Sequence, residues 1–280
     1  MKKALLVSLS VVIALAAVSC KKDKKASGPR YGVDGVTPLP TAIDMGTIVN
    51  GKTVNWASFN LGASRYYEYG GYYAWGETVA YCTSMDPVEW AERDEKVLHY
   101  DWASYIHANG SKDKLIKYCP DTQAGAECWD NTARPEGPDG NNKLLPSDDV
   151  VHVKLGGKWR MPKEEDFAAL LALKENSNYT WEEMDLVTDS RGNEIKDFKG
   201  NAIYGLRITR KSTGATLFFP AAGYCEGENV AKSAGSNGYY WSSDMGTGTI
   251  NARSMTFSSS IITCGPSGRI YGFQIRPVVD

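Results

Sequence analysis

Residues 157–175 read GKWRMPKEEDFAALLALKE and carry the clearest helix signal in the chain. Four residues share one face of a helix at positions i, i+3, i+4 and i+7: Phe167, Leu170, Leu171 and Lys174. Pro162 suits the first turn, where its missing N–H costs nothing. The acids at 164–166 lie where the helix dipole favours negative charge. The stretch therefore predicts a helix over residues 163–175.

Strand patterns flank this helix on both sides. Before it, residues 44–61 hold two apolar runs around Asn50-Gly51, a dipeptide typical of a tight hairpin turn. A second short helix is expected near Glu89–Leu98. After the main helix, runs of alternating side chains predict strands at 203–209, 215–220, 239–243, 252–258 and 270–279. One helix followed by antiparallel-type strands predicts an α+β fold with twisted antiparallel sheets and long loops. We find no internal repeat of fixed period.

Composition narrows the class of protein. The chain has 280 residues, 42% of them hydrophobic and 23% charged, which excludes a wholly disordered, collagen-like or polytopic membrane protein. A formal net charge of -2 and a pI near 6.0 provide no broad basic surface for nucleic acid. The 28 Gly, 16 Tyr and 8 Trp, against 3 His, favour short strands, many turns and binding by stacking.

The N-terminus has the pattern of an export signal. In residues 1–19, two lysines precede an apolar run of about 15 residues, which is short for a membrane-spanning helix. Ala17-Val18-Ser19-Cys20 resembles the lipobox of bacterial lipoproteins, and this resemblance implies a lipid on Cys20. The alternative is an ordinary cleaved signal peptide. Residues 20–37 are expected to form a flexible polar tether. With lysine after Cys20, the lipoprotein resemblance implies the outer membrane, and the face of that membrane is left open.

Five cysteines follow Cys20. Cys119 and Cys128 lie nine residues apart across a loop, so a local disulfide is geometrically easy. Cys225 and Cys264 each follow a strand-like run and form a second candidate pair, which leaves Cys82 as the odd thiol. The alternative is that all five are reduced and buried. A zinc-type site is not expected, because there is no CxxC and the histidines lack ligand spacing.

Six ordered motifs resemble a known family. They are NWASFNLGA (55–63), YYAWGE (72–77), GKWRMP (157–162), FPAAG (219–223), YWSS (240–243) and GFQIRPV (272–278). Together they resemble the Fibrobacter succinogenes major paralogous domain, common in Bacteroidetes lipoproteins, over about residues 40–280. The resemblance implies a C-type lectin-like fold, related to that of formylglycine-generating enzymes, in a single domain at 38–280. A long insertion at about 78–150 departs from the family pattern.

Catalysis is not expected. A formylglycine-generating oxidase needs two closely spaced reactive cysteines late in the chain, and residues 245–280 contain only Cys264. A hydrolase with paired carboxylates is the weaker alternative, because residues such as Glu77, Glu165 and Asp244 would have to converge in space. No Gly-x-Ser-x-Gly elbow marks a nucleophile.

Binding by aromatic side chains is the favoured function. Residues 66–77 contain six aromatics in twelve positions, and alternation sends some of them outward. The alternative is that these aromatics belong to the core, with Tyr hydroxyls hydrogen-bonded at its rim. The candidate ligand-binding residues are Tyr66, Tyr67, Tyr72, Trp75 and Trp241. Exposed aromatics stack on sugars and anchor protein interfaces equally well. We therefore expect a cell-envelope binding or adhesion module for a glycan or protein; the alternative is a structural or adhesive surface subunit with a protein partner.

Calcium is the one candidate cofactor. Asp139-Gly140-Asn141-Asn142 offers oxygen ligands that suit Ca²⁺. Asp244 ends Trp-Ser-Ser-Asp, which resembles the Trp-Asn-Asp calcium motif of lectins with Ser in place of Asn, although the Glu-Pro-Asn partner motif is absent. The candidate metal ligands are thus Asp139, Asn141 and Asp244. The alternative is that 139–142 is an ordinary turn and Trp241 belongs to the core.

Overall fold

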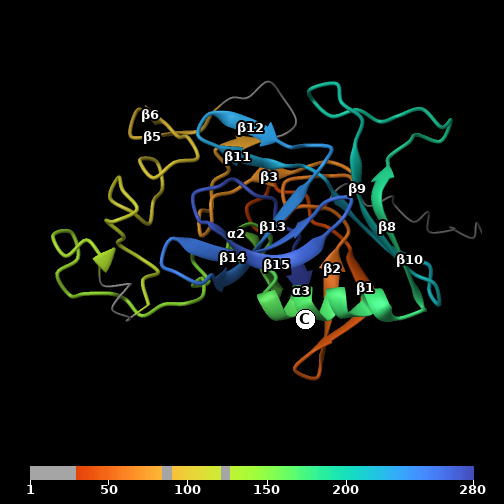
Figure 1. Cartoon of the computed structure of the whole chain (residues 1–280), viewed down its shortest axis with the longest axis horizontal. Helices are drawn as coiled ribbons and strands as arrows, with labels where there is room; N and C mark the ends of the chain where they lie inside the picture. Colours follow the sequence, from red (N-terminus) through yellow and green to blue (C-terminus); the bar gives the residue numbers. More distant parts are fainter. Residues whose placement is uncertain (1–29, 84–89, 121–126) are drawn as a thin grey trace, which may run out of the picture.

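The computed structural model describes residues 30–83, 90–120 and 127–280. The predicted signal peptide, Cys20 and the first part of the tether therefore lie outside the described residues. The described chain is mostly β, with several small antiparallel sheets and one longer helical segment (Figure 1). Within the described residues, no helix is both long and apolar enough to cross a membrane.

The predicted helix is confirmed. It consists of α3 (Glu164–Leu171) continued by the 3-10 helix η1 (Ala172–Glu175). Phe167 and Leu170 are fully buried, and the Phe167 ring packs 5.4 Å from the ring of Trp56. The buried face of α3 thus covers the main core cluster, which also contains residues of the neighbouring sheets.

A four-stranded sheet joins the two ends of the described chain. Its order is β1 (Ala42–Val49), β2 (Lys52–Ala57), β16 (Val278–Val279) and β7 (Trp159–Arg160). The predicted hairpin is confirmed, because Asn50 and Gly51 connect β1 to β2 with φ of 50° and 76°. Both residues have the positive φ that a tight type I′ turn requires.

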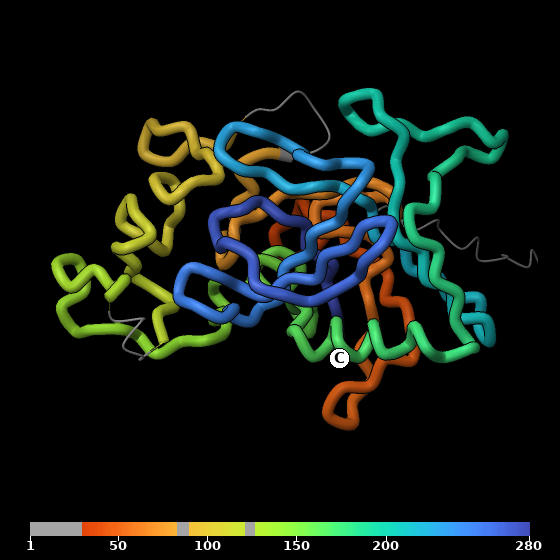
Figure 2. The backbone as a smooth tube through the Cα atoms, in the orientation of Figure 1, coloured from red at the N-terminus to blue at the C-terminus, as the bar shows by residue number. Residues whose placement is uncertain are grey.

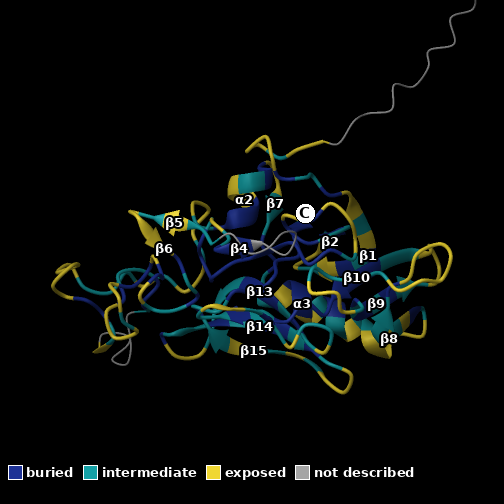
Figure 3. Cartoon of the chain, turned by 90° about the horizontal axis from the view of Figure 1, so that it is seen from above, coloured by how far each residue is buried: buried dark blue, intermediate teal, exposed yellow. Residues whose placement is uncertain are grey.

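The remaining sheets are small. One contains β8 (Tyr179–Leu186), β9 (Tyr204–Arg210) and β10 (Ala215–Pro220) in the order β10-β9-β8, and another contains β13 (Gly238–Met245), β14 (Asn251–Phe257) and β15 (Ile262–Gly268). Three are two-stranded: β3 (Gly71–Tyr72) with β4 (Cys82–Thr83), β5 (Glu92–Arg93) with β6 (Lys96–Val97), and β11 (Tyr224–Glu226) with β12 (Asn229–Lys232). Buried residues concentrate around α3, β13 and β14 (Figure 3).

Four of the five strands predicted after the helix are present, and two other predictions are wrong. Residues 270–279 form a strand only at Val278–Val279, because the preceding residues make isolated bridges to different segments. The short helix expected near Glu89–Leu98 is the β5–β6 hairpin instead, with Asp94 and Glu95 at φ of 51° and 62°. Strands β8 and β15 and the short helix α2 (Val150–Leu155) were not predicted.

Hydrogen bonds in the interior join four of the six quoted motifs in pairs. The Trp75 indole N–H donates to the Ser242 carbonyl (2.9 Å), and the Trp241 indole N–H donates to the Tyr73 carbonyl (2.8 Å). These reciprocal bonds join segments far apart in the chain. Arg276 is fully buried and donates to Asn60 Oδ1, Ala57 O and Phe218 O.

The chain between β8 and β9 contains an eight-residue repeat. Residues 187–194 read VTDSRGNE and residues 195–202 read IKDFKGNA. In each octad the aspartate carboxylate accepts hydrogen bonds from the backbone N–H groups two and four residues later. Backbone hydrogen bonds of 2.9–3.0 Å also link Val187, Ile195 and Ile203 in a ring. The expectation of no fixed-period repeat is therefore wrong. The two octads form the teal projection at the upper right of Figures 1 and 2.

Candidate ligand-binding site

Three of the five predicted binding aromatics belong to the core. Tyr72, Trp75 and Trp241 are each 0% exposed, and the Tyr72 hydroxyl donates to the Ala222 carbonyl at 2.7 Å. Burial raises the pKa of Tyr72 well above its usual value. These three side chains cannot touch a ligand, which corrects the prediction. Tyr66 and Tyr67 remain at the surface.

Tyr67 lines a cavity of about 300 Å³ between the aromatic segment and the octad repeat. We call this cavity the Tyr67–Phe198 groove. Its lining residues are Arg65, Tyr67, Glu68, Tyr69, Ile195, Lys196, Asp197, Phe198 and Ile203. It thus combines aromatic rings with both signs of charge.

Tyr69 and Asp197 tie together the two sides of the groove. The Tyr69 hydroxyl donates to Asp197 Oδ2 at 3.3 Å. Burial and the nearby Asp197 carboxylate both raise the pKa of Tyr69, so the phenol stays protonated and keeps this bond. The other carboxylate oxygen of Asp197 accepts from the N–H groups of Lys199 and Asn201, both at 2.8 Å. Phe198 lies between these anchored residues, which fixes its backbone at the groove.

On the side of the groove opposite the octad repeat, polar side chains fix the orientation of Tyr67. Arg65 Nη1 donates to the Tyr67 hydroxyl at 2.7 Å, and its guanidinium lies 6.0 Å from the centre of the Tyr67 ring. Glu68 Oε2 accepts from the backbone N–H groups of Ser64 (2.7 Å) and Arg65 (3.1 Å). The segment 64–68 is therefore stabilised by hydrogen bonds made by its own side chains.

Aromatic surface continues beyond the groove. The Tyr66 ring is 39% exposed and packs edge-on against Tyr67 (5.1 Å) and Phe218 (5.5 Å). The Arg207 guanidinium lies 5.8 Å from the centre of the Tyr66 ring. Aromatic faces beside charged donors and acceptors are suited to a ligand with both C–H faces and hydroxyl groups.

Sequence reasoning missed Phe198. The two octad turns differ at this position, since the first carries Ser190 where the second carries Phe198. Phe198 could have been found by aligning the two octads. The alignment shows an aromatic residue in one turn where the other turn has a polar residue.

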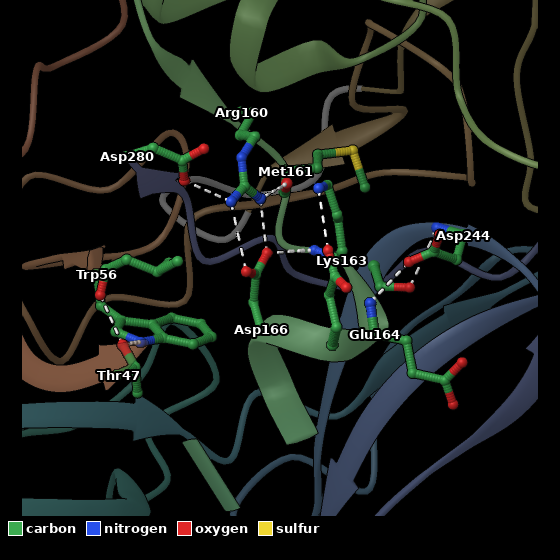
Figure 4. Close-up of polar contacts among 12 residues, drawn as sticks. Thr47, Trp56, Arg160, Met161, Lys163, Glu164, Asp166, Asp244 and Asp280 are labelled. Carbon is green, nitrogen blue, oxygen red and sulfur yellow. Dashed lines mark hydrogen bonds and ion pairs between the residues drawn. The ribbon is translucent and has the colours of Figure 1, made fainter. Parts of the chain in front are cut away.

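The candidate calcium ligands have other partners. Asp139 accepts from the N–H groups of Tyr118 (2.8 Å) and Cys119 (2.9 Å), and Asn141 Nδ2 donates to it at 2.9 Å. Asp244 accepts from the Glu164 N–H at 2.7 Å (Figure 4). Its other oxygen faces Lys143 Nζ at 3.4 Å. Donors and an ammonium group thus occupy the oxygens that a cation would need. Among the described residues, no group of three or more His, Cys, Asp or Glu is arranged to hold a metal ion.

A larger cavity of about 650 Å³ lies at the start of α3. The described charged residues that line it are paired: Lys143 with Asp244 (3.4 Å), Lys163 with Glu165 (3.0 Å) and Arg253 with Glu164 (3.3 Å). Glu165 and Asp244 both lie here, but Glu77 is buried elsewhere, 3.6 Å from Arg93. The three carboxylates considered for hydrolysis therefore do not converge on this cavity.

The cysteines are arranged differently from the predicted pairs. Cys225 Sγ lies 3.6 Å from Cys82 Sγ, the thiol expected to be left over. Cys264 lies on β15 and packs against the core cluster beneath α3, whereas Cys225 belongs to a different cluster. The predicted Cys225–Cys264 pair is therefore wrong. Cys119 and Cys128 pack in one cluster, and their bridge stays a prediction.

Comparisons with known proteins assign no activity. The profile of a family described as "Domain of unknown function (DUF8237)" matches residues 207–278, from β9 to β16. A search among curated proteins found no match, and a search among solved structures found none either.

Proposed function

We propose that this protein is a non-catalytic cell-envelope lipoprotein that recognises a glycan in the Tyr67–Phe198 groove. The observation that carries this proposal is the pairing of Tyr67 and Phe198 with Arg65, Lys196 and Asp197 around one cavity. Sugars present C–H faces that stack on aromatic rings and hydroxyls that bond to charged groups.

The size and rigidity of the groove support a small ligand. A volume of about 300 Å³ is at the lower end of small-molecule sites, which suits the terminal residues of a glycan chain. Internal hydrogen bonds hold both lining segments, so little conformational entropy is lost when a ligand orders them.

The six motifs remain the support for a C-type lectin-like fold of the Fibrobacter succinogenes major paralogous type. In this proposal the motif residues, exemplified by Arg276 and Trp241, build the scaffold, and the binding residues lie outside it. The octad projection inserted between β8 and β9 supplies one wall of the groove.

Glycan-array binding by the purified protein, in Ca²⁺ and again in chelator, tests this function. We expect defined glycans to bind in both conditions, because the groove carboxylates Glu68 and Asp197 already accept hydrogen bonds from the protein itself. Binding lost in chelator would contradict the groove as the site and return attention to Asp139, Asn141 and Asp244. A blank array in both conditions would contradict glycan recognition and favour a protein partner.

The lipid anchor is tested separately. We propose that Cys20 carries acyl chains, each contributing roughly 0.8 kcal/mol of membrane affinity per buried CH₂ group. The wild-type protein should partition with outer membranes, and a Cys20→Ser variant should not. A Cys20→Ser variant that still partitions into membranes would overturn the anchor.

A further inference from the structure

Two buried thiols from distant parts of the chain meet in the second core cluster. Cys82 lies on β4, near the start of the segment 78–150, and Cys225 lies on β11, inside the region 207–278. Their sulfur atoms are 3.6 Å apart, and the residues are 1% and 0% exposed.

Hydrogen bonds fix the backbone on both sides of this pair. The Cys225 N–H donates to the Gly272 carbonyl at 2.9 Å, and the Gly272 N–H donates to the Cys225 carbonyl at 3.0 Å. Next to Cys82, the Tyr100 hydroxyl accepts from the Tyr81 N–H (3.1 Å) and the Cys82 N–H (3.3 Å). To form a disulfide the sulfurs must approach from 3.6 Å to about 2.05 Å.

We propose that Cys82 and Cys225 form a structural disulfide, introduced by thiol–disulfide exchange while the protein folds. The oxidant is a molecule or protein that carries an exchangeable disulfide. The Cys82 thiolate attacks one oxidant sulfur, which forms a mixed disulfide and releases one thiolate. Cys225 then loses its proton and attacks Cys82 Sγ, which releases the second thiolate. Two protein thiols are oxidised, and the oxidant's disulfide is reduced to two thiols.

Burial determines when this exchange can occur. Both sulfurs are buried in the folded protein, so the oxidant reacts with a thiol before this cluster closes. Folding then brings the second thiol against the mixed disulfide.

The bond would attach the segment 78–150 to the rest of the domain. Cys82 and Cys225 are 143 residues apart, and a cross-link that closes so long a loop restricts the unfolded chain strongly. Between Cys82 and α2 the described chain contains little regular structure (left of Figure 2). A disulfide at the start of this segment would limit its separation from the rest of the domain.

Mass spectrometry of the wild-type chain tests the proposal. The full chain is refolded with a mixture of oxidised and reduced glutathione, alkylated, and digested without reduction. We expect one peptide pair joined through Cys82 and Cys225, with a mass two hydrogens below the sum of the free peptides. Finding both thiols alkylated, or either one joined to another cysteine, would overturn the proposal.

Thermal unfolding gives a second readout. Reduction should lower the Tm of the oxidised wild type by roughly 5–15 °C. The control variant Cys264→Ser should lose as much on reduction, whereas a Cys82→Ala/Cys225→Ala variant should show a clearly smaller loss, because only the predicted Cys119–Cys128 bridge is left to reduce. A double variant that responds like the wild type would contradict the pairing, and the wild-type mass measurement decides the matter if that variant does not fold.

Discussion

The Tyr69 hydroxyl and the Asp197 carboxylate lie 3.3 Å apart and join two segments separated by 128 residues. Tyr69 is 3% exposed, so its ring belongs to the interior while its hydroxyl reaches the base of the groove. One hydrogen bond thus connects the aromatic segment to the octad that carries Phe198. The proposed binding site depends on this connection.

The two octads provide a matched pair of variants. Asp197→Ala and Asp189→Ala each remove a carboxylate that holds its own turn, so both should lower the free energy of unfolding by about 1–2 kcal/mol. Only Asp197→Ala also removes the bond to Tyr69. It should weaken glycan binding at least about tenfold, a loss of about 1.4 kcal/mol. Equal binding losses in the two variants, measured by titration calorimetry, would exclude a special role for the second octad.

Gly223 should tolerate a side chain far less than Gly157. Both have positive φ, at 64° and 60°, so alanine costs about 1 kcal/mol at either position. At Gly223 a methyl group would also collide with the Lys232 carbonyl oxygen, whereas at Gly157 it meets nothing within 4 Å. Gly223→Ala should therefore destabilise the protein by roughly 3 kcal/mol or more. Denaturant unfolding of the two variants measures the difference, and equal midpoints would contradict it.

Arg160 compensates a buried carboxylate at the start of α3. Its guanidinium donates to Asp166 Oδ2 at 2.6 Å, and the Asp166 side chain is 0% exposed (Figure 4). Arg160→Met should cost about 3–5 kcal/mol, because the charge of Asp166 is then left buried without its cation. Adding Asp166→Leu should recover part of that loss. A double variant less stable than the single one, in urea unfolding, would show that the carboxylate is needed for another reason.

His107 should make the protein less stable in mild acid. Burial lowers its pKa to about 4, and its Nε2–H donates to the Gly76 carbonyl at 2.9 Å. Between pH 6.5 and 4 the unfolded chain binds a proton that the folded chain does not, so stability falls as the pH falls. The loss attributable to this residue is roughly 3 kcal/mol. His107→Gln keeps the donor without the titration, so its stability should fall less over this range. Parallel pH profiles for the two proteins would contradict this account.

Local patterns predicted local structure well. The α3–η1 segment follows from its apolar spacing, and the β1–β2 hairpin follows from Asn50-Gly51, because neighbours in sequence determine both. One failure is local, since the helix predicted near Glu89–Leu98 is the β5–β6 hairpin. The failures that concern the site are long-range. Trp75 and Trp241 are predicted to bind ligand, but both are buried. Their burial was not predictable from local sequence, because their hydrogen-bond partners, Ser242 and Tyr73, are 167 and 168 residues away.

The candidate site was predictable only in part. Tyr66 and Tyr67 follow from the density of aromatics in their segment, but the opposite wall lies more than 100 residues later. The same limit applies to Cys82 and Cys225, whose meeting depends on how β4 and β11 pack. No pattern within either segment reveals its partner.

The most direct test of the proposed function compares glycan-array binding by the wild type, Phe198→Ser and Ser190→Ala. Phe198→Ser gives the second octad turn the side chain that the first already has, so the turn should still form. We predict that the wild type and Ser190→Ala bind the same glycans and that folded Phe198→Ser binds none of them. Undiminished binding by folded Phe198→Ser would contradict the Tyr67–Phe198 groove as the glycan site.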